Sequence, residues 1–169
     1  MRPKETDLSP QHYAYTLLVE GDDVLAAVEQ QSSSTQKLLA SLDESQAGYR
    51  YADGKWSVKE VIGHLVDAER ILGYRALAIA RGDTQQLPGF DEQDYVRHAN
   101  FDAWSIGNLS EAYALARRAT IVFFQNLPEE AWSRRGNANG YEVTVHALAW
   151  TIAGHELHHR KTLRERYRL

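Results

Sequence analysis

Two histidines lie four residues apart, His155 and His159, near the end of a segment with helical hydrophobic spacing. Because an α-helix makes one turn in about 3.6 residues, this spacing places both imidazoles on one face. Two ring nitrogens on one face can bind a divalent metal ion. The alternative is a pair of hydrogen-bonded histidines at the edge of the core. Two histidines do not complete a metal site, so further ligands must come from elsewhere in the chain.

The amino-acid composition excludes several kinds of chemistry and several classes of partner. The 169 residues include no cysteine, which excludes disulfides, thiolate metal ligands and a cysteine nucleophile. The length suits one domain, 1–169, and the net charge of -4 is unlike the basic surface of a nucleic-acid-binding protein. No apolar run approaches the roughly 18 residues of a membrane span, and no apolar signal segment is present. We therefore expect a cytoplasmic protein with neither nucleic-acid nor membrane partners.

Helical periodicity and capping residues predict four long helices. Ser57 and Glu60 have capping-box spacing, Gly82 is suited to end the same helix, and Thr144 is suited to begin the last one. No segment alternates as a strand does. The sequence thus predicts an all-α four-helix bundle. The expected helices are about 21–42, 57–81, 105–127 and 144–167, with a short helix at 91–98, irregular chain at 8–20 and a loop at 136–140.

A third histidine, His64, lies at the edge of the apolar stripe of the 57–81 helix. The link at 82–104 is long enough to cross the bundle, so the second and fourth helices should be antiparallel. At ~1.5 Å per residue, His64 lies about 10 Å from the start of its helix, and the histidine pair lies about 13 to 19 Å from the end of theirs. These heights roughly match, so three imidazoles could meet, although His64 alone would be interpreted as a structural histidine.

Several other polar residues are expected to have structural or surface positions rather than to bind a metal ion. Glu69 projects into an apolar stripe, so we expect a buried ion pair with an arginine such as Arg70 or Arg75. His12 and His98 are expected at the surface. His158 is the main ambiguity, because it also lies near His155 on the helix.

Two stretches of the chain resemble the DinB-like (DinB/YfiT) superfamily of four-helix-bundle proteins. They are Lys55–Arg70 and Gly154–His159, and the similarity extends from about Gly21 over nearly the whole chain. The resemblance implies an up-down-down-up bundle with a long crossover between its second and third helices. It also implies a divalent metal ion held by one histidine of the second helix and two of the fourth, and these positions are His64, His155 and His159.

The resemblance also implies a class of chemistry. Characterised members include thiol transferases and a mycothiol-dependent isomerase, and the resemblance makes a homodimer a plausible expectation. We therefore expect a divalent ion, zinc or nickel, that activates water or a thiol for transferase or hydrolase chemistry on a small-molecule substrate. Because the chain has no cysteine, any thiol must come from a low-molecular-weight cosubstrate.

Three carboxylates lie near the predicted ligands in sequence, namely Glu60, Asp67 and Glu156. Each is a candidate to orient a ligand imidazole or to act as a base. The alternative is that all three are solvated carboxylates on helix surfaces.

Two further hypotheses compete with this enzyme. His155 and His159 enclose Glu156 in an H-E-x-x-H pattern, the zinc peptidase motif, but Thr162 and Glu165 replace the glycine and histidine of its longer form. The other hypothesis is a non-enzymatic stress or interaction protein whose metal ties two helices together. Chelation separates these hypotheses, because removing a structural metal should unfold the bundle.

Overall fold

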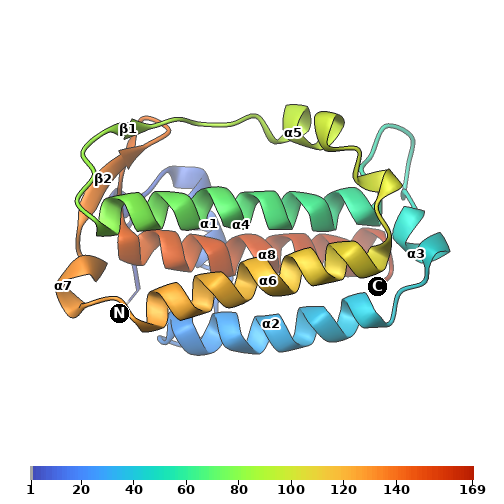
Figure 1. The fold of residues 1–169 in the computed structure, drawn as a ribbon, viewed down its shortest axis with the longest axis horizontal. Coiled ribbons are helices and arrows are strands. Elements are labelled where there is room, and N and C mark those ends of the chain that lie inside the picture. Colours follow the sequence, from blue (N-terminus) through green and yellow to red (C-terminus); the bar gives the residue numbers. More distant parts are fainter. Residues whose placement is uncertain (1) are drawn as a thin grey trace.

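Four long helices form a bundle in the computed structural model, which describes residues 2–169 (Figure 1). They are α2 (Val24–Ala40), α4 (Val58–Ala80), α6 (Ile106–Gln125) and α8 (Val145–Arg166). In Figure 1, α2 and α8 run in one direction, and α4 and α6 run in the other. The predicted four-helix bundle and its up-down-down-up order are confirmed.

The helix boundaries follow local side-chain chemistry. Ser57 accepts a hydrogen bond from the backbone N–H of Glu60, and the Glu60 carboxylate accepts one from the N–H of Ser57. Ser105 and Thr144 begin α6 and α8 in a similar way, because each hydroxyl accepts from an N–H in the first turn. Gly82, at φ +83°, ends α4 in the left-handed conformation that glycine adopts readily.

The link between α4 and α6 runs back along the bundle, as expected of a crossover (Figure 1). It contains β1 (Gln86–Leu87), α5 (Glu92–Ala99) and η2 (Phe101–Ala103). The predicted short helix is thus present as α5. This crossover brings Pro88 and Phe90 beside α4, near the site described below.

A small sheet replaces the loop that was predicted at 136–140. β2 (Arg135–Ala138) pairs antiparallel with β3 (Tyr141–Thr144), and β1 adds to β2 in parallel. Asn139 and Gly140, both at positive φ, form the two-residue turn of the hairpin. The prediction of a loop was wrong because strands of two to four residues are too short to show alternation in sequence.

The N-terminal segment is also more ordered than predicted. Residues 8–20 were expected to be irregular, but they contain the helix α1 (Pro10–Thr16), which follows the turn η1 (Glu5–Asp7). Ser9 caps α1 and Pro10 occupies its first position, where a missing N–H costs nothing. α1 packs against α8, and this long-range contact is invisible to local periodicity.

Two clusters of buried side chains fill the bundle. One surrounds Trp150 and Phe124 near the sheet, and the other surrounds Tyr113 and Ile62 toward the opposite end. The short helices α3 (Glu44–Gly48) and α7 (Glu129–Trp132) lie at opposite ends of the bundle (Figure 1).

Buried charges cross the middle of the bundle between α4, α6 and α8. Arg117 of α6 donates to Glu69 at 2.8 and 3.0 Å and also pairs with Glu156 of α8. The predicted buried ion pair of Glu69 with an arginine is confirmed, but neither Arg70 nor Arg75 is its partner. Arg117, 48 positions away in sequence, binds Oε2 of this carboxylate instead.

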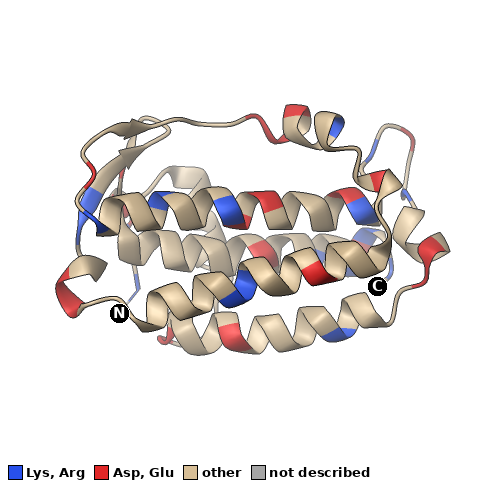
Figure 2. Ribbon diagram, in the orientation of Figure 1, with Lys and Arg blue, Asp and Glu red and all other residues tan. Residues whose placement is uncertain are grey.

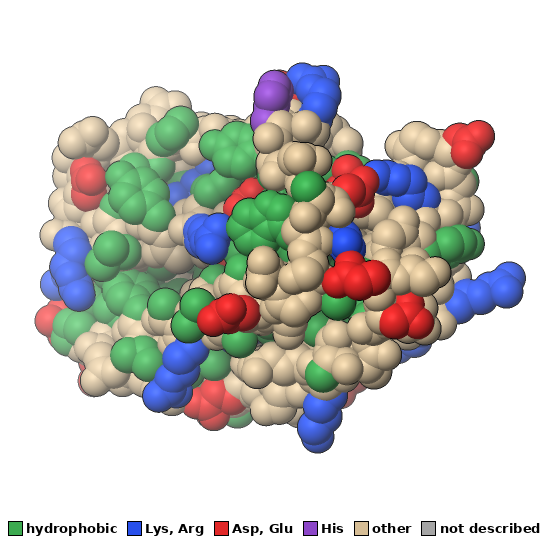
Figure 3. Space-filling model, turned by 45° about the vertical axis from the view of Figure 1, so that its right-hand side comes forward, with side chains coloured by type: hydrophobic (Ala, Val, Ile, Leu, Met, Phe, Trp, Pro, Cys, Tyr) green, Lys and Arg blue, Asp and Glu red, His purple; other side chains and the backbone are tan. Residues whose placement is uncertain are grey.

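The surface carries charges of both signs, which are interspersed along the chain (Figure 2). Hydrophobic side chains gather toward the left of the face drawn in Figure 3. Exposed hydrophobic residues of α4 and α6 include Tyr74, Leu77 and Val122. None of the helices within residues 2–169 is long and apolar enough to cross a membrane.

Candidate metal centre

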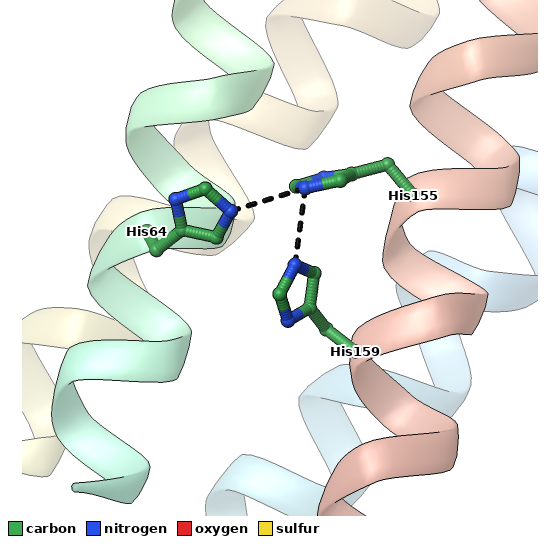
Figure 4. A group of neighbouring side chains, drawn as sticks. All are labelled: His64, His155 and His159. Atoms are coloured by element: carbon green, nitrogen blue, oxygen red, sulfur yellow. Dashed lines mark hydrogen bonds between the residues drawn. The ribbon is translucent and has the colours of Figure 1, made fainter. Parts of the chain in front are cut away.

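Three imidazoles meet between α4 and α8. Nε2 of His155 lies 3.1 Å from Nε2 of His64 and 3.1 Å from Nε2 of His159 (Figure 4). One ring nitrogen from each residue falls within 4.8 Å of the other two. The structure therefore brings together the three histidines that the resemblance singled out.

A glycine precedes His64 and another precedes His155, and each admits a neighbouring segment. A Cβ on Gly63 would lie 2.4 Å from the ring of Phe101, and a Cβ on Gly154 would lie 2.1 Å from the carbonyl oxygen of Tyr15. The missing side chains let η2 approach α4 and α1 approach α8 beside the histidines. Close packing at these two points thus helps to define where the imidazoles lie.

Aromatic rings flank the cluster. The ring of Trp56 lies 5.0 Å from that of His64, and the ring of Tyr15 lies 5.6 Å from that of His155. Side chains packed in this way have few alternative rotamers. The rings of Trp56 and Tyr15 therefore limit the orientations open to the imidazoles of His64 and His155.

Burial keeps these histidines neutral. It lowers the pKa of His64 to about 4, with a smaller contribution from His158, and lowers the pKa of His159 to about 3, with smaller contributions from His64 and His158. The pKa of His155 is also lowered, first by burial and then by the neighbouring histidines. Neutral imidazoles retain a nitrogen lone pair, which is the form that binds a metal ion.

The donor set fits a divalent cation. Metal–nitrogen bonds of about 2.0–2.1 Å, at angles between a right angle and the tetrahedral angle, separate two nitrogens by about 2.8–3.4 Å. The two Nε2 separations of 3.1 Å fall within that interval. Hydrogen bonding satisfies the cluster less well, because Nε2 of His155 cannot donate to both neighbours. Three imidazoles without a fourth protein ligand are typical of a catalytic rather than a structural site.

A cavity of about 300 Å³ opens beside the three histidines. Its walls come from α1, α4, α8, the crossover and the hairpin turn. Sequence reasoning missed several of its lining residues, because they belong to segments that meet only after folding. The Ser9–Pro10 pair could have indicated α1 as a helix. The missed residues include Gln11, Tyr15, Trp56, Arg75, Phe90 and Asn139.

The remaining histidines differ in their relation to the cavity. His158 lines it, but is not part of the three-histidine group. His12, on the unpredicted helix α1, also lines it; this residue is half-buried and is not part of the three-histidine group, and its pKa is lowered by burial and by Arg75. His98 is exposed on α5, and its Nδ1 lies 2.7 Å from the carbonyl oxygen of Asp94.

The three candidate carboxylates lie outside the cavity lining. Glu60 caps α4 and pairs with Arg50, and Asp67 lies 3.6 Å from Arg70. Glu156 is 1% exposed and is bound by Arg117 and by two hydroxyl groups in the core. Glu156 is therefore not placed as the base of an H-E-x-x-H peptidase, and any role of Glu60 or Asp67 in orienting an imidazole stays a prediction.

Comparison with known proteins agrees with the architecture. A family model described as the DinB superfamily matches residues 27–163. No curated protein matches the chain in sequence.

Solved structures share the fold at low sequence identity. YfiT from Bacillus subtilis, described as a probable metal-dependent hydrolase with an unusual four-helix bundle topology, is 18% identical with a TM-score of 0.67, over 99% of this chain and 92% of that one. A mycothiol-dependent maleylpyruvate isomerase is 17% identical with a TM-score of 0.66, over 81% of this chain and 58% of that one. A DinB-like protein from Bacillus subtilis, YjoA, is 20% identical with a TM-score of 0.61, over 87% and 90%.

Proposed function

The chain belongs to the DinB superfamily, and we propose that it is a metal-dependent enzyme that acts on a small molecule. One observation supports this most strongly: three neutral imidazoles present their Nε2 atoms to one another beside a cavity. His64, His155 and His159 would hold a divalent ion, zinc or nickel. When bound, such an ion lowers the pKa of a coordinated water or thiol, so that a nucleophile forms near neutral pH.

Other features of the chain would position the histidines and limit the size of the substrate. The rings of Trp56 and Tyr15 restrict the imidazoles of His64 and His155, so the donor atoms need little rearrangement. The cavity, at about 300 Å³, suits a small substrate rather than a polypeptide. Since the chain has no cysteine, a sulfur nucleophile would enter as a low-molecular-weight thiol.

Metal content tests the first part of the proposal. Wild-type protein loaded with zinc and then dialysed should retain about one metal ion per chain by elemental analysis. The double variant His155→Ala, His159→Ala should retain almost none, while His98→Ala, which changes an exposed histidine outside the cavity, should behave as wild type. Equal metal content in the wild type and the double variant would refute the site.

Two assays test the reaction class. Hydrolysis of p-nitrophenyl acetate uses water as the nucleophile, and conjugation of 1-chloro-2,4-dinitrobenzene uses an added thiol. We expect metal-loaded wild type to accelerate at least one reaction, and the metal-free protein and the double variant to accelerate neither. A metal-loaded protein that accelerates neither reaction, and that unfolds on chelation, would favour the non-enzymatic structural role.

A further inference from the structure

Arg75 lines the same cavity as the histidines but has no role in holding them. It follows His64 by eleven residues on α4, which at 100° per residue returns almost to the same helix face, about 16 Å along the axis. Its side chain is 4% exposed. Helical side chains lean toward the N-terminus of their helix, which is the direction in which His64 lies from Arg75.

The partners of Arg75 are neutral. Its Nη2 donates to the carbonyl oxygen of Pro88 at 2.6 Å, and its guanidinium carbon lies 6.0 Å from the centre of the Phe90 ring. Among the ion pairs of residues 2–169, none involves Arg75. Burial lowers its pKa, but an arginine stays charged at any physiological pH.

Arg117 is a useful comparison with Arg75, because it is a buried arginine of the hydrophobic core. That residue is 1% exposed and pairs with both Glu69 and Glu156. Burying a cation without a counter-ion costs several kcal/mol of lost hydration free energy. Pairing with an anion offsets this cost. Arg75 differs because it lines the cavity of the histidines and a second cavity beside Tyr95, and a ligand in the first cavity can supply the anion.

The surroundings of Arg75 in the cavity are mostly uncharged. Gln11 and Asn139 line it with amide groups, and His12 lines it with an imidazole. Glu92 is the carboxylate that also lines it, but this residue is exposed in the first turn of α5 and forms no ion pair with Arg75. An entering anion would therefore meet an unshared positive charge.

We propose that Arg75 binds a carboxylate of the substrate or cosubstrate, while the opposite end of that molecule reaches the three histidines. This inference rests on the proposed function and adds the class of ligand: an anionic small molecule whose charged and reacting ends are separated by a short chain. The guanidinium can donate two parallel hydrogen bonds to a carboxylate, which gives orientation as well as attraction.

Two thiols of equal length test this assignment on the cobalt-loaded protein. 6-Mercaptohexanoate carries a terminal carboxylate and 6-mercaptohexanol a terminal hydroxyl, and the cobalt–thiolate absorption band reports binding of either. We expect the acid to bind at least tenfold more tightly than the alcohol in wild type. Shortening the acid to 3-mercaptopropionate should abolish the advantage, since its carboxylate falls short of Arg75. Equal affinity for the two longer thiols would overturn the proposal.

Variants assign the preference to one residue. Arg75→Gln removes the charge but keeps an N–H donor for the carbonyl of Pro88, and should reduce the acid-to-alcohol ratio to about one with the alcohol affinity unchanged. Arg118→Gln removes an exposed arginine of α6 and should leave the ratio as in wild type. A ratio that persists in Arg75→Gln would overturn the assignment. If that variant fails to fold, the side-chain Nε–H resonance of Arg75 in wild type should shift with the acid and not with the alcohol, and equal shifts would overturn it.

The metal-free protein separates this inference from the metal proposal. Hexanoate should still bind to it, and hexanol should bind more weakly, as measured by the same arginine resonance. If cobalt does not bind but hexanoate shifts the Arg75 signal, the metal proposal fails and the anion site stands. If cobalt binds and hexanoate has no effect beyond that of hexanol, the anion site fails and the metal proposal stands.

Discussion

The polar side chains on the two sides of α8 differ in their surroundings and in their partners. His155 and His159 face a cavity as neutral groups whose Nε2 atoms converge, whereas Glu156, between them in sequence, faces the core and is bound by Arg117, Tyr113 and Thr35. On the core side, side chains of the protein bind both carboxylate oxygens of Glu156. On the cavity side, the chain leaves donor atoms directed at a point that a ligand can occupy. Neighbouring residues of α8 thus face two different environments, the packed core and the cavity.

Removing the shared cation should have the largest effect on the core side. Arg117→Met leaves Glu69 and Glu156 buried without their counter-ion, and should lower the free energy of unfolding by about 3–5 kcal/mol. Urea denaturation measures this. Arg118→Met, at the exposed neighbouring position, should change it by less than about 0.5 kcal/mol. A loss below about 1 kcal/mol for Arg117→Met would mean that the network is not a major source of stability.

The same network explains which parts of the fold could be predicted. Ser57, Glu60, Gly82 and Thr144 act within a few residues of themselves, so their roles were readable in sequence. The partner of Glu69 lies 48 residues away and was misassigned, because pairing across helices depends on helix rotation.

The candidate site was predictable to a similar extent. The spacing of the two histidines of α8 was enough to indicate a possible metal site. His64 could be assigned to that site only from the family pattern and from the matching heights along antiparallel helices. The cavity walls were not predictable, because α1 and the hairpin are short elements held mainly by tertiary contacts. His12 and Arg75 were therefore not recognised as neighbours of the histidines.

Metal removal addresses the cavity side. At a free zinc concentration 100-fold above its dissociation constant, binding adds about 2.7 kcal/mol to the free energy of unfolding, and chelation should remove that amount. The helical circular dichroism of the metal-free protein should persist, because the bundle has its own extensive core. Loss of the helical signal on chelation would instead make the ion a structural component and weaken the contrast between the two sides.

The next largest effect on stability should come from acid, which protonates the cavity histidines of the metal-free protein. The folded-state pKa of His64 is about 4 and that of His159 about 3, both below the ordinary 6.5, so the unfolded chain binds more protons between these values. Stability is therefore fully present above pH 6.5 and falls as the pH falls toward 4. Lowering the pH from 7 to 5.5 should cost the metal-free protein about 2.5 kcal/mol from these two histidines.

The double variant His64→Ala, His159→Ala provides the control for this pH effect. It should lose much less stability over the same interval, as measured by urea denaturation at each pH. Equal pH dependence in the variant and the wild type would show that other groups, not these imidazoles, govern the acid response.

The smallest expected effect concerns the glycine beside His155. Gly154→Ala places a Cβ 2.1 Å from the carbonyl oxygen of Tyr15, so α1 must shift, at a cost of about 1–2 kcal/mol. Gly73→Ala on α4 is the matched control, because its nearest neighbour would lie 3.8 Å away and alanine favours a helix. Thermal unfolding of both variants measures the difference, and similar melting temperatures would show that α1 docks loosely.

The crossover has a consequence for how such proteins diversify. Two of the cavity walls come from the segment between α4 and α6 and from the turn it meets, where the backbone N–H of Asn139 donates to the carbonyl of Leu87. The histidines, by contrast, sit on the long helices. Substitutions or insertions in the crossover can therefore reshape what the cavity admits while the helices that carry the imidazoles keep their packing, so that one scaffold can acquire new substrates.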